Sequence, residues 1–204
     1  MSIVRFLALA LLSLAPVTAV ACGGDDSPAA PVGPPPAPGF SRVTGNGFTI
    51  DMPSGWQQPA LDPEAFARTA AALRERNPQL AKALEEARAE VGTGSRVFAI
   101  DPDDGSSVNL IVTTTGGRSL DDFVGQAIRE LQQVGVSDLR RDETSIGGRP
   151  ATRLAFGLAV TGESGTVAVP EEQYYVARSD TLFIVTLFGD SPGLAIIAES
   201  LRFG

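Results

Sequence analysis

The sequence contains no histidine and a single cysteine, Cys22. Without histidine the chain cannot build a Ser-His-Asp or Cys-His catalytic set, and it lacks the side chain that most often acts as a general base or metal ligand. A single cysteine forms no disulfide within the chain and cannot supply the thiolates of a structural zinc site. These absences exclude the commonest catalytic and metal-binding chemistries, so we expect no catalytic residues, no metal site and no cofactor.

The glycine-rich motifs of nucleotide-binding enzymes and hydrolases are also missing. Gly162–Gly165 reads Gly-Glu-Ser-Gly, which is the wrong spacing for a nucleophile elbow. Gly45–Gly47 does not begin a dinucleotide-binding loop, because Ile50 occupies the position of the third glycine. No Gly-Lys-Ser/Thr phosphate loop is present.

Carboxylates are plentiful, with 24 Asp and Glu residues. Neighbouring pairs such as Glu171-Glu172 and Asp121-Asp122 could serve a carboxylate-based hydrolase. Adjacent residues of a strand point to opposite faces, however, and such neighbours arise by chance in so acidic a chain. We therefore predict that the chain is not an enzyme and keep a carboxylate-based hydrolase as the least favoured alternative.

The acidic segment 101–105, Asp-Pro-Asp-Asp-Gly, could bind calcium or form a hairpin turn. It departs from the EF-hand pattern, because Gly105 is at its fifth position and Val112 stands where the bidentate Glu belongs. Asp-Gly between two alternating segments is a strong hairpin signal, so we predict a turn.

Basic residues are scarce. The chain has 16 of them, including one lysine, Lys82, against 24 acidic residues, for a net charge of −8. The absence of a basic cluster argues against nucleic acid as a partner and against direct adsorption to anionic lipid. Attachment to a membrane would then have to come from a covalent lipid.

The N-terminus has the pattern of an export signal. Arg5 precedes an apolar run over 6–21, which is too short for a secure bilayer span. Ala19-Val20-Ala21-Cys22 resembles the bacterial lipobox, which implies lipidation of Cys22 and anchoring on the extracytoplasmic face of the cell membrane. The alternatives are an ordinary cleaved signal that leaves a free thiol, and an uncleaved anchor.

The composition divides the chain into three parts. We predict a lipoprotein signal peptide over residues 1–21 and a folded domain over 46–204. Between them, residues 22–45 hold the lipidated Cys22 and a disordered tether, since 23–39 contains six Pro and four Gly.

Periodicity predicts an α+β domain, an antiparallel β-sheet flanked by helices, because most strands are linked as hairpins and the helices are separate. We expect strands over 46–53, 96–100, 108–114, 139–146, 150–160, 173–178 and 181–188, with a Gly-rich loop at 161–165. The apolar run Thr181–Phe188 predicts a central strand. Helices are expected as a hairpin insert over 62–91, from Ser119 to Gly135, and from Ser191 to the end.

Three aromatic residues carry a polar group. Trp56 follows a strand and either packs on the core, which we favour, or lines a pocket mouth. Strand alternation places one of Tyr174 and Tyr175 outward, where it becomes a candidate contact residue.

Three segments, FTIDMPSGW, EEQYYVARSDTLFIVTLF and IIAESLRF, together resemble the Mog1/PsbP-like lipoproteins of actinobacteria, of the LpqN type. The resemblance covers roughly residues 46–203. It implies an α/β/α sandwich around an antiparallel sheet, no enzyme chemistry, and an envelope-partner or lipid-related role.

We therefore expect a membrane-tethered, non-enzymatic envelope lipoprotein that binds a protein partner. The alternative is a carrier or chaperone for an apolar, lipid-like ligand, with the hairpin at 62–91 as a lid over a cavity lined by Phe66, Leu73, Leu80 or Leu84. The sequence leaves the ligand-binding residues and the oligomeric state open.

Overall fold

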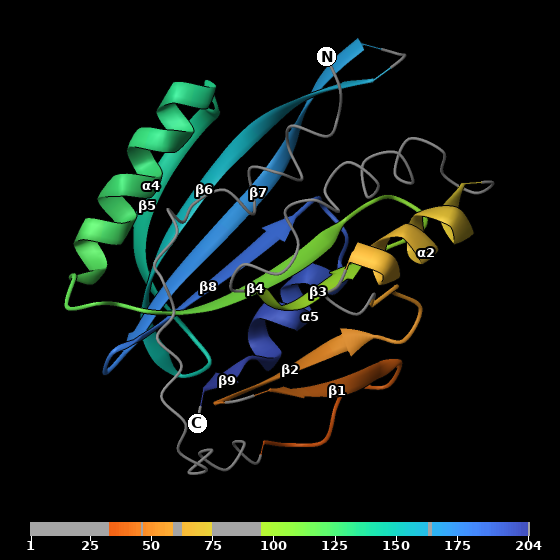
Figure 1. Ribbon diagram of the computed structural model, residues 1–204, viewed down its shortest axis with the longest axis horizontal. Coiled ribbons are helices and arrows are strands. Elements are labelled where there is room, and N and C mark those ends of the chain that lie inside the picture. The colour runs from red at the N-terminus through yellow and green to blue at the C-terminus, as the bar shows by residue number, and fades with distance from the viewer. Residues whose placement is uncertain (1–32, 46, 59–62, 75–94, 163–164, 204) are drawn as a thin grey trace.

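The computed structural model describes residues 33–45, 47–58, 63–74, 95–162 and 165–203 (Figure 1). Its elements are β1 (Phe40–Gly45), β2 (Phe48–Pro53), α2 (Pro63–Leu73), β3 (Ser95–Ile100), β4 (Ser107–Thr114), α4 (Leu120–Val134), β5 (Ser137–Ile146), β6 (Arg149–Gly162), β7 (Gly165–Arg178), β8 (Thr181–Phe188), α5 (Gly193–Ser200) and β9 (Arg202–Phe203). None of the helices in these ranges is both long and apolar enough to cross a membrane.

A six-stranded antiparallel sheet forms the centre of the molecule, in the order β3-β4-β8-β7-β6-β5. A second antiparallel sheet has the order β1-β2-β9. The predicted α+β class is confirmed. The predicted central strand is confirmed too, because β8 lies between β4 and β7 and is buried from Leu182 to Leu187.

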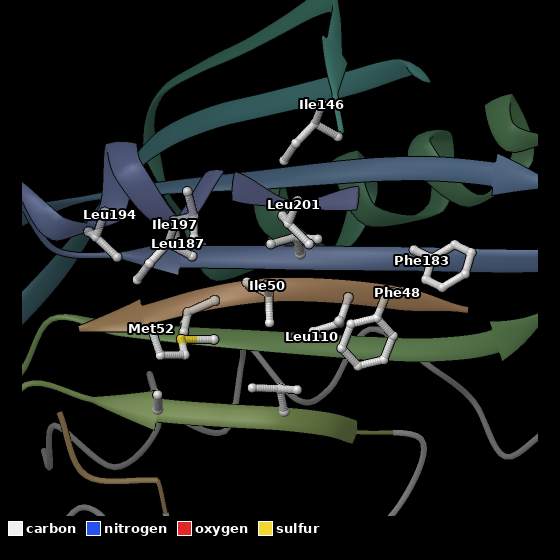
Figure 2. Close-up of a cluster of buried hydrophobic side chains, with 14 of the residues drawn as sticks. Phe48, Ile50, Met52, Leu110, Ile146, Phe183, Leu187, Leu194, Ile197 and Leu201 are labelled. Carbon is white, nitrogen blue, oxygen red and sulfur yellow. The ribbon is translucent and has the colours of Figure 1, made fainter. Parts of the chain in front are cut away.

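Each face of the main sheet has its own core. Helix α4 covers one face with Phe123, Val124, Ala127 and Leu131. The opposite face packs against α5 and β2. There, buried side chains of the main sheet, of β2 and of α5 form one cluster (Figure 2). Helix, sheet and helix therefore form successive layers, and each strand of the sheet centre contributes alternate residues to the two cores.

Helix α4 forms where the sequence marks both of its ends. The side chain of Ser119 accepts the backbone N–H of Asp122, and the Asp122 carboxylate accepts the N–H of Ser119, which completes a capping box. Gly135 ends the helix in the left-handed region at φ 80° and donates to the carbonyls of the last turn. Both predicted ends are confirmed.

Residues 40–45, predicted as part of the tether, form β1 and pair with β2 along their whole length. The predicted domain boundary at residue 46 is therefore wrong, and the folded domain includes β1. The segment follows a Pro-rich stretch and has little apolar character, so its strand conformation depends on pairing with β2 rather than on local propensity.

Strand β7 begins at Gly165, well before the predicted start at 173, and β6 extends to Gly162. The two strands pair as far as Gly162 and Gly165. Residues 161, 162 and 165 of the predicted loop therefore belong to the strands of a hairpin. Proline cannot donate to a strand ladder, and Pro170 lies within β7. It is tolerated because the ladder to β8 begins only at the next residue.

Candidate functional site

A half-open groove of about 810 Å³ lies between α5 and the face of the main sheet formed by β5, β7 and β8. Its apolar lining comes from Ile146, Leu187 and Leu194, with Ala195 and Ala198 on the helix. Binding pockets in proteins commonly have volumes of about 300 to 1,000 Å³. Within the described part of the chain, this groove is the concave feature on which we base a binding site.

Helix α5 forms one wall and is held in place by its other face. Ile197 and Leu201 are fully buried in the core between α5, β2 and the sheet (Figure 2). The hydroxyl of Ser200 accepts the N–H of Asp51 on β2 at 2.9 Å and donates to the carbonyl of Ile197 at 2.8 Å. The position of the wall is thus set by both packing and a hydrogen bond.

The floor of the groove carries two polar side chains, Tyr174 and Glu172, which are linked to Arg153 on the neighbouring strand. Tyr174 and Glu172 lie on the same face of β7, and the Tyr174 hydroxyl donates to Glu172 Oε2 at 2.5 Å. Arg153 on β6, the register partner of Tyr174, forms a salt bridge with the other carboxylate oxygen of Glu172. Burial and the Glu172 carboxylate raise the pKa of Tyr174, so its hydroxyl stays protonated and acts as a donor.

The remaining charges line the edge of the groove. Asp190 and Glu199 are exposed, and neither forms an ion pair among the described residues. The guanidinium of Arg202 binds backbone atoms: its Nη1 donates to the carbonyls of Glu199 and Leu201 at 2.6 Å each. The groove lining therefore contains three carboxylates, those of Glu172, Asp190 and Glu199, and one guanidinium, that of Arg202.

The far wall of the groove is the end of β5 and the turn that follows it. Gly147 and Gly148 form this turn with φ values of 60° and 74°. A Cβ atom on Gly147 would lie 2.8 Å from the carbonyl oxygen of Leu201 and 2.9 Å from the Phe203 ring. The turn therefore rests directly on the chain that follows α5, and glycine is required for that contact.

The opposite face of β7 buries a second polar row. Tyr175 donates to Gln173 Oε1 at 2.7 Å, and Gln173 Nε2 donates to Glu171 Oε1 at 2.9 Å. Glu171 is 2% exposed, and its Oε2 accepts no hydrogen bond from the described residues. Its register partners on the neighbouring strands are Phe156 and Phe188.

Burial raises the pKa of Glu171 to about 8, and the hydrogen bond from Gln173 offsets only part of that increase. Burial also raises the pKa of Tyr175, with the charges of Glu171 and Glu130 adding to the effect. This row lies within the core on the α4 side and does not line the groove. Glu171 therefore affects the stability of the folded domain, whereas its neighbour Glu172 belongs to the candidate site.

No protein-family model and no curated protein matches the chain. Solved structures are similar at low identity. The cyanobacterial PsbP protein (CyanoP) of Synechocystis sp. PCC 6803 has a TM-score of 0.48 and 13% identity, over 91% of this chain and 98% of that one. LpqN of Mycobacterium tuberculosis, described as involved in cell envelope biogenesis, has a TM-score of 0.44 and 13% identity, over 80% and 89%.

A Pseudomonas aeruginosa protein of unknown function has a TM-score of 0.35 and 18% identity over 44% of this chain. The chain spans 62% of that protein's length, and 45% of the length of a Bacteroides thetaiotaomicron protein that it also matches. None of these similarities assigns a family or a function to the chain.

The candidate residues predicted from the sequence have different outcomes. Trp56 is 8% exposed and packs in the core, which confirms the favoured interpretation. The predicted turn at 101–105 is also confirmed, because Asp101 Oδ1 and Asp104 Oδ1 each accept a backbone N–H two residues on. Of the two tyrosines, Tyr175 is buried and Tyr174 faces the groove.

Other predictions concern residues or side chains that the structure does not describe. These include Cys22, the signal peptide, the second half of the helical hairpin, and the side chains proposed to line a lipid cavity, Phe66, Leu73, Leu80 and Leu84. Among the described side chains, no group of three or more acidic, histidine or cysteine residues is placed to hold a metal ion.

Residues 33–39, which belong to the predicted tether, lie against the domain. Arg42 on β1 makes two hydrogen bonds to the buried Asp51, Nε to Oδ1 at 2.7 Å and Nη2 to Oδ2 at 3.0 Å. The same guanidinium donates to the carbonyls of Gly33 at 3.3 Å and Pro34 at 2.5 Å. Gly33 also lies beside Arg202, a residue of the groove. Arg42 therefore holds residues 33 and 34 against the domain.

Replacing Arg42 with Ala is expected to release residues 33–38 from the domain, because it removes every hydrogen bond just described, whereas the carbonyl of Gly39 still accepts the N–H of Ser54. Limited proteolysis followed by mass spectrometry should then show faster cleavage before Phe40, while the circular dichroism spectrum keeps its folded form. Arg42→Lys is the matched control, since it retains the charge but loses the planar fork, and it should give an intermediate rate. An unchanged cleavage pattern in Arg42→Ala would contradict this role.

Proposed function

We propose that this chain is a membrane-tethered, non-enzymatic envelope lipoprotein of the LpqN type that binds a protein partner through the groove beside α5. Cys22 carries the lipid in this proposal, and the protein is held on the extracytoplasmic face of the cell membrane. The lipobox pattern and the Pro-rich segment support the anchor. The groove, with its apolar lining and three carboxylates, is the observation that carries the binding role.

The position of the tether supports a partner that is itself close to the membrane. Ten residues lie between Cys22 and Gly33, which lies against Arg42 and Arg202. Even in a fully extended polyproline form, such a segment reaches only about 35 Å. The groove would thus be held within a short distance of the lipid headgroups.

A carrier of an apolar, lipid-like ligand is the second candidate. Its predicted cavity involves side chains that the structure does not describe, and the described groove is less suited to that cargo. Carboxylates oppose the headgroup of an anionic lipid, and the charged residues Glu172, Asp190 and Glu199 all line the groove. A protein partner is therefore the proposal that the groove favours.

Photo-crosslinking at adjacent positions of α5 tests this proposal. Ala195 is exposed and lines the groove, whereas Ile196 is exposed on the same helix but does not line it. With benzoylphenylalanine at residue 195 of the full-length chain in native envelopes, we expect one discrete crosslinked protein in every replicate. The same residue at position 196 should give none. Equal patterns at the two positions, or a recovered adduct that extracts as lipid, would contradict the proposal.

Filling the groove is expected to prevent binding. Ala195→Trp places a bulky ring in the groove without touching the buried side of α5, whereas Ile196→Trp makes the same kind of change outside it. Affinity capture of the crosslinked protein should fall about ten-fold or more in Ala195→Trp, because steric overlap abolishes shape complementarity at a contact centre. Equal capture by the two variants would show that the partner binds elsewhere.

A further inference from the structure

The charges of the groove are the basis for identifying what it binds. Glu172 is satisfied within the protein, since it accepts the Tyr174 hydroxyl and pairs with Arg153. Asp190 and Glu199 are exposed and have no ion pair in the described part of the chain. Both could accept charge-assisted hydrogen bonds from a ligand.

The one guanidinium of the lining does not compensate for these carboxylates. The Arg202 Nη1 atom donates to two backbone carbonyls, those of Glu199 and Leu201. Glu199 is in the last turn of α5 and Leu201 is its C-cap, so the cation is placed where the helix dipole favours it. The chain as a whole carries a net charge of −8, which adds to the negative potential of the groove.

The lining between the charges is apolar. Leu187 and Leu194 are 5% and 7% exposed, Ile146 is 4% exposed, and the Tyr174 ring lies beside them. Carboxylates at the edge of an apolar lining match a ligand with the complementary arrangement, a cation next to an apolar group. An aromatic ring adds a favourable surface for a guanidinium or ammonium group.

We infer that the groove binds a polypeptide segment in which an arginine or lysine stands next to apolar side chains. This inference rests on the proposed function, and it names the chemistry of the partner. The apolar side chains contact Ile146, Leu187 and Leu194, and the cation pairs with Asp190 or Glu199 at the edge of the groove. An anionic segment is rejected by the same two carboxylates.

The test compares two fluorescent peptides that differ in one group. The probes are tetramethylrhodamine-labelled Ala-Leu-Arg-Leu-Ala-amide and the same labelled peptide with citrulline, which has the shape of arginine without its charge. Anisotropy is measured against the full lipidated chain in nanodiscs of zwitterionic lipid, with empty nanodiscs as the blank. We expect the arginine peptide to bind about five-fold more tightly, and increasing salt from about 50 to about 500 mM to reduce that difference.

Neutral variants of the two carboxylates locate the binding. Asp190→Asn and Glu199→Gln should each weaken the arginine peptide about two- to five-fold, and the double variant about ten-fold, with little effect on the citrulline peptide. Glu64→Gln is the control, because Glu64 on α2 is an exposed acid that does not line the groove. It should leave the affinity unchanged.

The outcomes separate this inference from the proposed function. Equal binding of the two peptides, or failure of both to bind while residue 195 still crosslinks a protein, overturns the inference and leaves the function standing. A captured protein whose crosslinked segment has no basic residue also overturns it. Loss of both peptide binding and crosslinking overturns both.

Discussion

Glu171→Gln is expected to remove a large loss of stability that the wild-type chain undergoes as the pH rises toward alkaline values. The Glu171 carboxyl has its pKa raised from 4.5 to about 8 by burial. Its neutral form is therefore the one that favours the folded state. This contribution to stability is fully present below about pH 4.5 and is lost as the pH rises through about 8.

The size of the effect follows from the shift. Each pKa unit corresponds to about 1.4 kcal/mol, so full ionisation of Glu171 lowers the free energy of unfolding by about 5 kcal/mol. That is a large part of the roughly 5 to 15 kcal/mol by which domains are stable. Glutamine stays neutral at every pH and retains the oxygen that accepts the Gln173 N–H, so the variant should keep its stability.

Urea denaturation from about pH 5 to about pH 9 measures this difference. The sequence makes the profile simple to interpret, because it has no histidine, and the pKa values of Tyr174 and Tyr175 are raised out of this range. Glu172→Gln is the control, since this neighbour faces the groove and should leave the alkaline loss in place. The assignment fails if Glu171→Gln loses stability as steeply as the wild-type chain does.

Gly147→Ala is the second substitution for which we expect a large effect. Gly147 is in the left-handed region, which costs an L-residue about 1 to 2 kcal/mol. The added methyl group would also lie 2.8 Å from the Leu201 carbonyl oxygen, which is backbone and cannot rotate away. Overpacking of this kind costs about 1 to 3 kcal/mol more. The free energy of unfolding should therefore fall by about 3 kcal/mol.

Gly148 provides a matched control in the same turn. Its φ of 74° is also left-handed, but a Cβ there meets no atom within 4 Å. Gly148→Ala should thus cost only the backbone strain, about 1 to 2 kcal/mol. Denaturant midpoints compare the two variants, and equal losses would show that the turn does not rest on Leu201. Because the turn also lines the groove, Gly147→Ala should weaken the arginine peptide more than Gly148→Ala does.

The features that the sequence predicted well are encoded locally. Helix α4 follows from a capping box at Ser119, a periodic apolar stripe and a terminal glycine, which all lie within one short segment. The turn before β4 follows in the same way from Asp-Gly and its flanking carboxylates. The continuous apolar run of β8 likewise indicated a central strand.

The prediction failed where a strand depends on its partner. β1 and the first half of β7 carry weak local signals, and their pairing with β2 and β6 makes them strands. Glu171 illustrates the same limit at one side chain. Alternation predicted that Glu171 and Glu172 point to opposite faces, but it could not tell which face would be buried between Phe156 and Phe188.

The sequence by itself determined the fold class, the ends of α4 and the central position of β8, because each depends on composition or on short-range pattern. It likewise excluded histidine-based catalysis and zinc sites built from several cysteines. The tertiary structure alone decided the groove. Its lining comes from β5, β7, β8 and α5, which the order of the sheet brings together from separate parts of the chain. It also decided that Glu171 is buried and Glu172 faces the groove, because burial is set by what packs on each face and not by the residue itself.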